Sequence, residues 1–431
     1  MEQQFINSGY ETVKNSQKAD IYVVNTCSVT NMAERKSRQM LRRVKEINPS
    51  SIIVVCGCYA QVAKDELCQI PEINIILGIN EKNNIVKIVE DYIKREENKK
   101  EAEVSDVLFQ KEFIDFGDVT YTEKNRAVIK VQDGCNMFCS YCIIPYARGR
   151  IRSRKIESVV SEITKIANQD IKEVVITGIH VASYGKDFDK ENDQKNKIRL
   201  IDLLEAINKI DGIERIRLSS LEPTLINKEF VERLSKLEKI CDHFHLSLQS
   251  GCDATLKRMN RKYTTKQYKE AVELLKEYYP DASFTTDVIV GFPGETEEEF
   301  EKTYQFLKEI NFYKMHVFKY SQRRGTVAEK MPNQIDGNIK EIRSNRLIEL
   351  SEQNENNHNL KYIGKTVKVL FEEFENGYFK GHTTNYIVVK VPEKEENSRY
   401  FVNQIIPVKI TDNTKERELI GKINWQINFK C

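Results

Sequence analysis

The chain has 431 residues, of which 40% are hydrophobic and 31% charged, and its net charge is +2. This length predicts two or three domains with separate cores, and the composition is that of a soluble globular protein. The sequence shows neither an apolar run of membrane-spanning length nor a signal-peptide pattern, so we expect a cytoplasmic protein. The small net charge excludes nucleic-acid binding through an overall field, so RNA contacts would need local basic patches.

The first region, residues 1–95, alternates short apolar runs with helical patterns. Strands are predicted at Ile21–Asn25, Ile52–Cys56 and Ile73–Leu77, and helices at Asn31–Ile47, Ala60–Leu67 and Asn83–Arg95. Strands that alternate with helices indicate a small parallel α/β sheet. Residues 96–124 are charged and weakly patterned, and we expect a linker there, with Arg95–Glu103 as a disordered charge run.

The second region, residues 125–358, repeats a strand–helix unit about six times. Its strands are predicted at Ala127–Val131, Glu173–Thr177, Arg215–Ser219, His243–Leu248, Thr286–Val290 and Lys314–Phe318. The last helix is expected over Asn338–His358, and Lys186–Lys197 reads as a surface loop. Six units are too few for a closed eight-stranded barrel, so we predict an open, partial (β/α)6 barrel.

The last region, residues 359–426, changes to short alternating strands. These are predicted at Lys365–Glu373, Tyr378–Thr384, Tyr386–Val391 and Phe401–Ile410. The pattern predicts a small β-barrel of the size that binds nucleic acids, although a purely structural β-domain fits the spacing too. The predicted fold class is therefore α/β, with an N-terminal parallel α/β domain, a partial (β/α)6 barrel and a C-terminal β-barrel.

Three of the ten cysteines form a CxxxCxxC motif directly after the strand AVIKVQDG. They are Cys135, Cys139 and Cys142. Clustered cysteines in a cytosolic chain indicate metal or redox ligands, and iron–sulfur clusters are held by thiolates close together in a loop. Three thiolates leave one iron of a 4Fe–4S cluster open to a chelating small molecule. A structural zinc with one remote ligand is the alternative.

Two further cysteines, Cys27 and Cys58, each follow a predicted strand of the first region. Loops after neighbouring parallel strands leave the sheet at one edge, so the two thiols can converge on a second cluster. The alternative is two ordinary buried cysteines. Isolated cysteines such as Cys68 and Cys241 read as small core residues.

The CxxxCxxC loop resembles the signature of the radical-SAM superfamily. The resemblance implies that S-adenosylmethionine (SAM) binds the open iron and is cleaved to a 5′-deoxyadenosyl radical. In this superfamily an aromatic residue is favoured just before the last cysteine of the motif, and Tyr141 occupies that position here. Barrel sites form at the C-terminal ends of parallel strands, where the expected cofactor-binding residues are Thr177, Gly178, Glu222, Gln249, Ser250 and Asp287.

Longer strings along the chain together resemble the methylthiotransferase family. They are NTCSVTNMAERKSRQ, GCYAQ, QDGCNMFCSYCIIPYARGRIRSR, TGIHVASYG, SSLEP, SLQSGCDATLKRMNRKYT and DVIVGFPGETEEEF. The terminal β-region resembles a TRAM domain. The SVTN…KSRQ string and GIHVASYG look like the branch that acts on N6-threonylcarbamoyladenosine in tRNA.

This resemblance implies two 4Fe–4S clusters, with Cys27 and Cys58 as ligands of the auxiliary one. One SAM would methylate a sulfur associated with that cluster, and a second would yield the radical that activates C2 of adenine 37. The implied partners are the tRNA anticodon stem-loop, a reductant such as flavodoxin or ferredoxin, and a sulfur donor. The family's third auxiliary cysteine, in a TxGC-type string, is expected upstream of Met1. Cys56 is an alternative ligand, because an extended backbone would place it on the same face as Cys58.

Two other functions fit the same residues. One keeps the chemistry but changes the substrate to another modified adenosine or a ribosomal protein, and the other is an idle iron–sulfur RNA-binding protein. Basic residues that suit RNA, or equally a solvated surface or carboxylate partners, occur in five groups. They are Arg148, Arg150, Arg152 and Arg154; Arg35, Arg38, Arg42 and Lys45; Lys257, Arg258, Arg261 and Lys262; Arg323 and Arg324; and Lys365, Lys368, Lys380 and Arg399, the last four among the aromatic residues Phe371, Phe374, Tyr378, Phe379 and Tyr386.

Overall fold

The computed structural model describes residues 1–14, 17–28, 31–95, 99–115, 117, 125–189, 197–393 and 401–423. The chain forms two compact units. The first combines residues 1–120 with segments 133–153 and 321–331, and the second holds residues 121–132, 154–320 and 332–431. The cysteine motif therefore belongs to the same unit as the N-terminal region.

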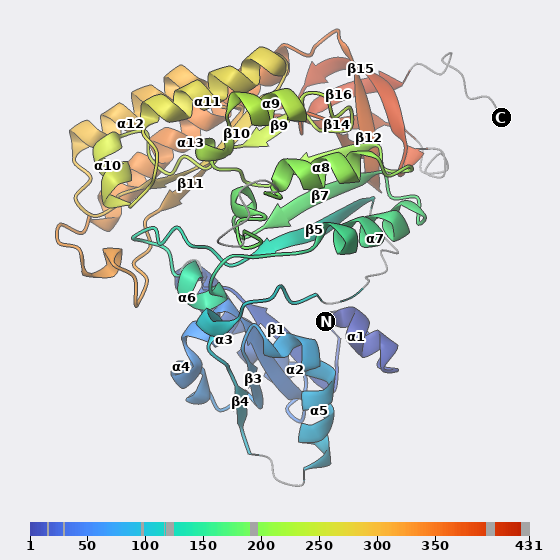
Figure 1. The fold of residues 1–431 in the computed structure, drawn as a ribbon, viewed down its shortest axis with the longest axis vertical. Coiled ribbons are helices and arrows are strands. Elements are labelled where there is room, and N and C mark those ends of the chain that lie inside the picture. The colour runs from blue at the N-terminus through green and yellow to red at the C-terminus, as the bar shows by residue number, and fades with distance from the viewer. Residues whose placement is uncertain are drawn as a thin grey trace. The chain divides into compact units, whose positions relative to one another are not determined.

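The first unit is built on a parallel sheet, shown in blue in Figure 1. Its strands lie in the order β1 (Ile21–Thr26), β2 (Ile52–Gly57), β3 (Ile75–Leu77) and β4 (Glu101–Glu103). The predicted parallel α/β sheet is confirmed. Glu101–Glu103 corrects the expectation of a disordered charge run, because its backbone pairs with β3 as the edge strand.

Helices cover both faces of this sheet, since its strands carry apolar side chains on both sides. One apolar cluster lies under α1 (Glu2–Asn7) and α5 (Ile85–Lys94). The other lies under α2 (Asn31–Ile47), α3 (Cys58–Val62) and α4 (Lys64–Cys68). The prediction of one helix over Ala60–Leu67 is wrong, because the backbone of Ala63 (φ −132°, ψ 38°) separates α3 from α4. The first unit also contains the short helices η1 (Glu81–Asn84), η2 (Val107–Phe109) and α6 (Ile144–Arg148) and strand β6 (Arg152–Ser153).

The second unit contains an open, curled set of six parallel strands. The order is β5 (Arg126–Asp133), β7 (Glu173–Gly178) and β8 (Arg215–Leu218), then β9 (His243–His245), β10 (Ser283–Val290) and β11 (Lys314–Lys319). Isolated parallel bridges such as Leu221 to Leu246 join the two triplets. The predicted partial (β/α)6 barrel is confirmed.

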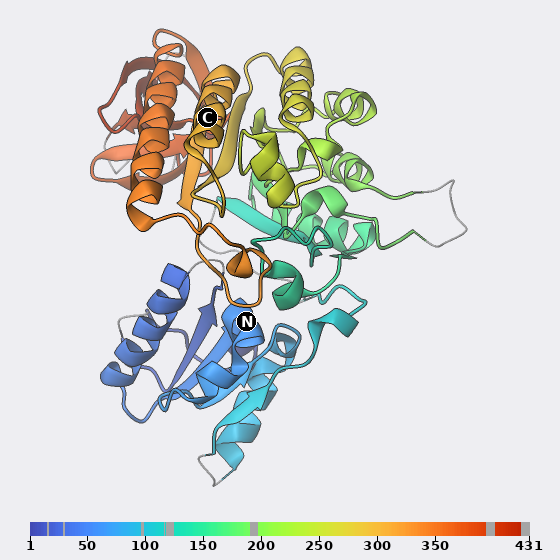
Figure 2. The same cartoon turned by 90° about the vertical axis from the view of Figure 1, so that its left-hand side faces the viewer.

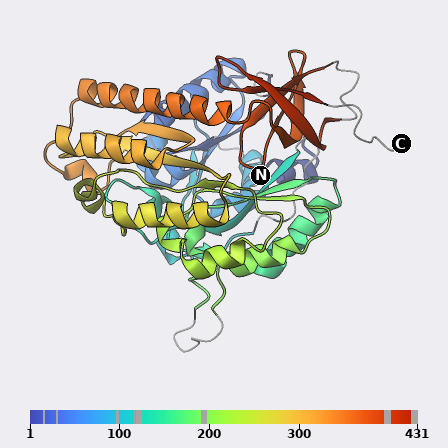
Figure 3. The same ribbon diagram turned by 90° about the horizontal axis from the view of Figure 1, so that it is seen from above.

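Helices cover one face of these strands and enclose a single apolar cluster. They are α7 (Ile156–Ala167), α8 (Leu200–Asn208), α9 (Lys228–Leu234), α10 (Asp253–Arg258), α11 (Thr265–Tyr278), α12 (Glu297–Ile310) and α13 (Gly337–Leu360). The short turns η3 (Val181–Ser183) and η4 (Pro223–Leu225) lie between these elements. The turn η5 (Ala328–Lys330) belongs to a segment of the first unit. Figure 3 shows α11, α12 and α13 side by side. The opposite strand face is partly open at β5, where Ala127 and Ile129 point into the core and Val128 between them is 57% exposed.

A closed five-stranded barrel ends the second unit, shown in red beside α13 in Figure 2. Its strands are β12 (Thr366–Glu375), β13 (Tyr378–His382), β14 (Val388–Pro392), β15 (Ile405–Asn413) and β16 (Leu419–Ile423), in the order β12-β13-β14-β16-β15. The predicted β-barrel is confirmed, although β16 was not predicted.

Arg215 and Arg217 of β8 tie the barrel to the curled strands. The Arg215 guanidinium donates to the carbonyl oxygens of His382 and Lys368, and that of Arg217 donates to those of Thr383 and Thr384. These donors satisfy buried main-chain oxygens, so the two parts of this unit share one polar seam. Separately, no helix in the described ranges has both the length and the apolar character needed to cross a membrane.

Candidate functional site

The cysteine loop leaves β5 at Asp133 and is held in place by its own backbone. Gly134 has φ +70°, and a Cβ there would lie 1.8 Å from the carbonyl oxygen of Arg150, so only glycine fits. The Cys135 amide donates to the carbonyl oxygen of Gly149 at 3.0 Å. The amide of Met137 points at the Cys135 sulfur (3.4 Å). This N–H···S contact suits a metal-bound thiolate, because such sulfurs accept hydrogen bonds from loop amides.

The three thiols of this loop are the residues that would hold an iron–sulfur cluster. Cys139 is buried, whereas Cys135 and Cys142 are partly exposed. Within the described ranges, no three His, Cys, Asp or Glu side chains gather closely enough to hold a single ion. Thiolates that bind different irons of a cluster do not have to meet at one point. The three cysteines would therefore hold the cluster, and Tyr141, partly buried between them, remains a predicted contact of the cofactor.

The second cysteine set lies at the ends of adjacent strands of the first unit. Thr26 of β1 pairs in register with Gly57 of β2, so Cys27 and Cys58 follow directly opposed residues. The Thr26 hydroxyl donates to the carbonyl oxygen of Cys56 at 2.6 Å, which ties the strand ends together. Cys27 is exposed and Cys58 is 7% exposed.

Cys56 does not share a face with Cys58, contrary to the expectation from an extended backbone. Gly57 has φ +103°, and a Cβ at that position would lie 2.3 Å from the carbonyl oxygen of Thr26. The chain turns there and enters α3, so Cys56 packs into the cluster under α1 and α5. Cys58 instead packs with Ile79 and Val107. Burial raises the pKa of the Cys56 thiol, as expected for an inert core cysteine.

Most arginines that were candidate RNA contacts are paired inside the protein. Arg152 and Arg154 are 1% and 7% exposed, and they pair with Asp133 and Glu162. The four alternating arginines do not share a face, because Arg148 ends helix α6 and Gly149 turns the chain. Carboxylate partners, the alternative considered from the sequence, therefore explain these residues.

Three other candidate basic groups are also largely paired. Arg323 is buried and donates to the Ser28 carbonyl oxygen and to Glu34, which anchors the loop after Cys27. Arg258 pairs with Glu299, and Arg38 donates to Tyr59 and Glu66. Only the remaining exposed basic residues of these groups are therefore available to contact RNA.

In the second unit, the ends of β7 and β8 carry a buried polar cluster around Glu222. Glu222 is 4% exposed and accepts a hydrogen bond from Arg261 at 2.5 Å. His180, two residues after Gly178, places Nε2 3.5 Å from the same carboxylate. Burial would raise the pKa of Glu222, but the neighbouring His180 imidazole and the charge of Arg261 outweigh burial and lower it. Glu222 is therefore ionised at neutral pH.

Among the residues that the structure describes, three buried atoms of this cluster have no hydrogen-bond partner: Oε2 of Glu222, Nε2 of His180 and Oγ of Ser219. Buried polar atoms are normally satisfied, so the group is suited to a polar ligand such as the hydroxyls of a nucleoside. This fits the predicted SAM-binding role of Glu222 and its neighbours Thr177 and Gly178. His180 and Arg261 were not predicted as site residues; the GIH string was the available signal for His180.

The remaining predicted cofactor residues lie on the β9–β10 side. The Gln249 amide donates to the carbonyl oxygen of Asp287 at 2.8 Å, and Gln249 has φ +71°. The Asp287 carboxylate lies 3.3 Å from Nε2 of His245. Ser250 is fully buried, and its hydroxyl contacts Thr303 of α12 at 3.2 Å. Gln249 and Asp287 thus lie together, whereas the Ser250 side chain faces the outer helices.

We expect Glu222→Gln to weaken SAM binding about 10- to 100-fold. The substitution removes a charged acceptor, and hydrogen bonds to charged groups contribute about 1.5–3 kcal/mol. Isothermal titration of SAM into the iron-loaded protein measures the change. The exposed Glu238→Gln is the control, and equal affinities in the two variants would contradict the assignment.

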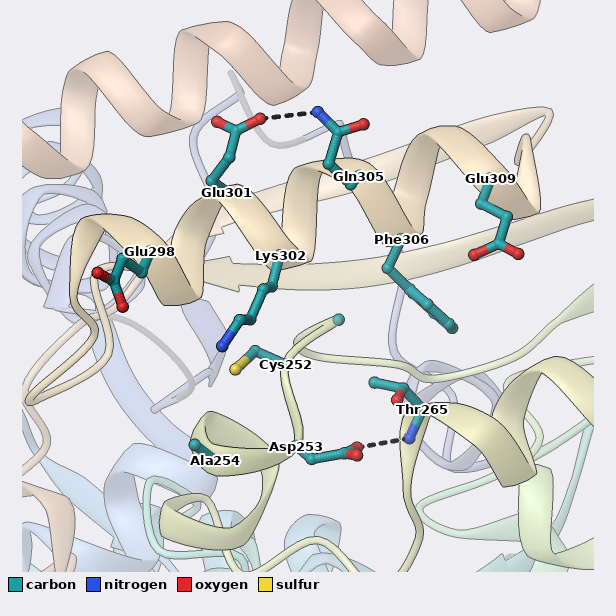
Figure 4. A pocket seen from close by; sticks show the side chains of 11 residues that line it. Cys252, Asp253, Ala254, Thr265, Glu298, Glu301, Lys302, Gln305, Phe306 and Glu309 are labelled. Carbon is teal, nitrogen blue, oxygen red and sulfur yellow. Dashed lines mark hydrogen bonds between the residues drawn. The ribbon is translucent and has the colours of Figure 1, made fainter.

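One pocket lies away from these residues. It has a volume of about 740 Å³ and is lined by residues from the start of α10 and α11 and from α12. Figure 4 shows Asp253 accepting from the Thr265 amide, and Glu298 and Glu309 at the pocket's ends. It contains none of the predicted site residues and lies among the outer helices, so we do not assign it to the site.

The barrel has a row of exposed lysines on β12, β15 and β16. Lys409 of β15 is paired directly with Lys422 of β16. On the other side of β15, Lys409 is paired with Thr366 of β12, and Lys368 follows two residues later on the same face of that strand. We call Lys368, Lys409 and Lys422 the lysine row. Like charges opposed across strands are unfavourable without a counter-anion, and no carboxylate pairs with them among the described residues.

The other barrel residues proposed for RNA have different roles. Lys380 pairs with Glu373 and Glu418. Phe371 and Phe379 are fully buried in the barrel core. Tyr386 stacks on His243 and His382, and Arg399 lies outside the described residues. Lys409 and Lys422 were missed, because only the strand register brings them together.

Two family models match the chain. The Radical SAM superfamily model matches residues 129–307, and a model described as Uncharacterized protein family UPF0004 matches residues 1–78. The first match spans the cysteine loop and five of the curled strands. The second spans the strands that carry Cys27 and Cys58.

Similar proteins extend over nearly the whole chain. A Bacillus subtilis protein named threonylcarbamoyladenosine tRNA methylthiotransferase MtaB is 40% identical over 95% of this chain and 89% of its own length. A protein of the same name from Aquifex aeolicus is 42% identical over 90% and 92%. A tRNA-2-methylthio-N(6)-dimethylallyladenosine synthase from Caldicellulosiruptor saccharolyticus is 38% identical over 92% and 83%.

Solved structures share the fold. One of them, the radical S-adenosylmethionine methyltransferase TsrM from Kitasatospora setae, superimposes with a TM-score of 0.53 at 15% identity, covering 70% of this chain and 62% of that chain. This likeness concerns the fold alone.

Proposed function

Because the chain belongs to the methylthiotransferase family of radical-SAM enzymes, we propose that it converts N6-threonylcarbamoyladenosine at position 37 of tRNA into its 2-methylthio derivative. The observation that carries this proposal is the 40% identity, over 95% of the chain, to a relative named for that nucleoside. The two cysteine sets in the first unit support it, because each part of the chemistry needs its own sulfur-ligated site.

The overall reaction balances in atoms and electrons. The C2–H bond of the adenine breaks and a C2–S bond forms, which is a two-electron oxidation of the substrate. It is matched by reductive cleavage of one SAM to methionine and 5′-deoxyadenosine, which carries the abstracted hydrogen. A second SAM would give its methyl group to a sulfide-level sulfur from the sulfur donor and leave as S-adenosylhomocysteine. The SAM-site cluster, when bound, would supply the one electron that starts cleavage, and one electron would be returned when the C2–S bond forms.

We assign the protein's own groups accordingly. Cys135, Cys139 and Cys142 would hold the SAM-site cluster, and Cys27 and Cys58 would be ligands of the auxiliary cluster. Tyr141, Thr177, Gly178, Glu222, Gln249, Ser250 and Asp287 are assigned to the SAM side, with Ser250 acting through its backbone. We also propose domains at residues 1–95, 125–358 and 359–426, a cytoplasmic location, and a low-potential reductant and a sulfur donor as partners.

Mass spectrometry of digested tRNA tests the function directly. The chain is expressed in a host that makes N6-threonylcarbamoyladenosine but lacks the methylthio derivative. We expect the 2-methylthio nucleoside to appear with this chain and not with a Cys139→Ala variant. A 2-methylthio derivative of dimethylallyladenosine instead would transfer the assignment to the substrate of the third relative. Absence of both products, with iron-loaded protein, would reject the function.

The lysine row is our proposed tRNA contact of the barrel. We expect the triple variant Lys368→Gln/Lys409→Gln/Lys422→Gln to bind tRNA more weakly. The slope of log affinity against log salt should fall by roughly 0.7–0.9 for each lysine that contacts a phosphate. Filter binding over a salt series measures this slope. The control is Lys380→Gln/Lys390→Gln, whose ammonium groups already pair with Glu418, and an equal effect of both variants would contradict the assignment.

A further inference from the structure

Lys82 is a buried cation of the first unit that the proposed function does not yet use. It lies in η1, is 6% exposed, and its Nζ donates to Oδ1 of Asn25 at 2.8 Å. Within the described ranges, no carboxylate lies at ion-pair distance from it. A buried ammonium with only an amide partner is strongly disfavoured unless an anion lies close by.

The groups around Lys82 identify where that anion would be. Burial lowers the pKa of Lys82, while the nearby sulfurs of Cys56 and Cys58 and the carboxylate of Asp133 oppose the shift. Asn25, its hydrogen-bond partner, is two residues before Cys27 on β1. The ammonium is thus held beside the strand ends that carry the second cysteine set.

Arg148 approaches the same set from the helix that follows the CxxxCxxC loop. Its Nε donates to Sγ of Cys58 at 3.2 Å, and its Nη1 lies 3.6 Å from Oδ2 of Asp133. Asp133 lies 3.6 Å from Arg152 as well, so one carboxylate is shared by two guanidinium groups. Burial alone would lower the pKa of Arg148. The neighbouring Cys58 and Asp133, and to a smaller extent Cys27, outweigh burial and raise that pKa.

The buried ammonium of Lys82, bound to Asn25, and the partly buried guanidinium of Arg148, bound to Cys58, therefore both lie beside the second cysteine set, with Asp133 as the carboxylate next to Arg148. This excess of positive charge matches a negatively charged sulfur site. An iron–sulfur cluster with thiolate ligands carries negative charge, and one-electron reduction adds another. Hydrogen bonds to sulfur and neighbouring charges are the protein's means of setting a cluster's potential.

We propose that Lys82 and Arg148 stabilise the negative charge of the iron–sulfur cluster at Cys27 and Cys58, and so raise its reduction potential and retain it on the protein. The inference rests on the auxiliary cluster of the proposed function. Arg148 also links that site to the other one, because it is six residues from Cys142 and pairs with the residue at the start of its loop.

The test uses the full chain with Cys135, Cys139 and Cys142 all changed to serine, so that bound iron reports on the second site. The protein is reconstituted with ferrous iron and sulfide. Iron per chain and the midpoint potential, followed by electron paramagnetic resonance, are then measured for Lys82→Met, Arg148→Gln and Arg148→Lys. We expect the potential to fall by at least about 59 mV in Lys82→Met and in Arg148→Gln, a tenfold change in the one-electron equilibrium. Iron loss to a chelator should be faster in both variants.

Matched controls separate charge from folding. Lys87→Met and Arg150→Gln remove exposed cations from the neighbouring helix and from the same arginine run, and should leave the potential unchanged. Arg148→Lys keeps the charge without the guanidinium geometry, so its potential should lie between those of wild type and Arg148→Gln. It also provides the test if Lys82→Met does not fold.

Either of two results would overturn the proposal: no iron in the three-serine background, or potentials equal to the controls with iron bound. The readout is a potential and not a product, so it is independent of the tRNA assay. A shifted potential without tRNA product would uphold this inference and reject the assigned substrate. Formation of the tRNA product without any shift in potential would uphold the assigned substrate and reject this inference.

Discussion

Changing any one of Cys135, Cys139 or Cys142 to alanine is expected to abolish the formation of 5′-deoxyadenosine from SAM and, with it, the methylthio product. Each thiol lies in one loop that is held by Gly134, the Gly149 carbonyl and the Met137 amide, and no other cysteine lies in that loop. Chromatographic quantification of 5′-deoxyadenosine after chemical reduction is the measurement. Each variant should also lose the iron bound at this loop.

Cys68→Ser is the control for this experiment. Cys68 ends helix α4, is partly buried and belongs to neither cysteine set. We expect it to keep both iron and SAM cleavage. If an alanine variant of the motif retained SAM cleavage at the wild-type rate, the loop would not be the cofactor site.

Arg217→Met is expected to be the most destabilising single substitution among those considered. Arg217 is 3% exposed, and its Nε donates to Glu173 at 2.8 Å while its other nitrogens donate to the carbonyl oxygens of Thr383 and Thr384. Removing Arg217 leaves the buried Glu173 carboxylate with Arg215 alone, 3.8 Å away, and breaking a buried ion pair costs up to about 3–5 kcal/mol. Thermal unfolding of the full chain, compared with wild type, measures this loss.

The surface substitution Arg233→Met is the matched control. Arg233 also pairs with two carboxylates, Asp202 and Glu205, but about a third of its side chain is exposed, so we expect less than about 1 kcal/mol. The double variant Arg217→Met/Glu173→Gln should be more stable than the sum of the single effects predicts, because neither charge is then left alone. Strict additivity would show that Arg217 acts through packing.

The same pair makes the folded state sensitive to acid. Burial would raise the pKa of Glu173, but Arg217 and Arg215 outweigh it and hold that pKa below its usual value. A depressed pKa in the folded state means that the stabilisation is present above the unfolded pKa and is lost as the pH falls through the folded one. The stability difference between wild type and Glu173→Gln should therefore shrink on acidification, as measured by thermal unfolding over a pH series.

The sequence was a good guide wherever the signal was local. The apolar runs predicted β1, β2 and the strands of the curled sheet to within a few residues, because the hydrophobic pattern of a buried strand lies in consecutive residues. Strand β4 was missed since its three residues are charged or small, and only pairing with β3 makes them a strand. Strand β16 was also missed, because its five residues form a strand by pairing with β14 and β15 in the closed barrel.

Local sequence patterns are therefore enough to establish the cysteine spacing, the order of strands and helices, and the family strings that imply the chemistry. Which charges remain available to a partner depends on the folded structure. Arg152, Arg154 and Arg261 look like RNA contacts in sequence, but each meets a carboxylate that lies apart from it along the chain, at Asp133, Glu162 or Glu222. Lys409 and Lys422 become neighbours only through strand register. The physical reason is that an ion pair depends on distances in space, which the local periodicity of a sequence does not record.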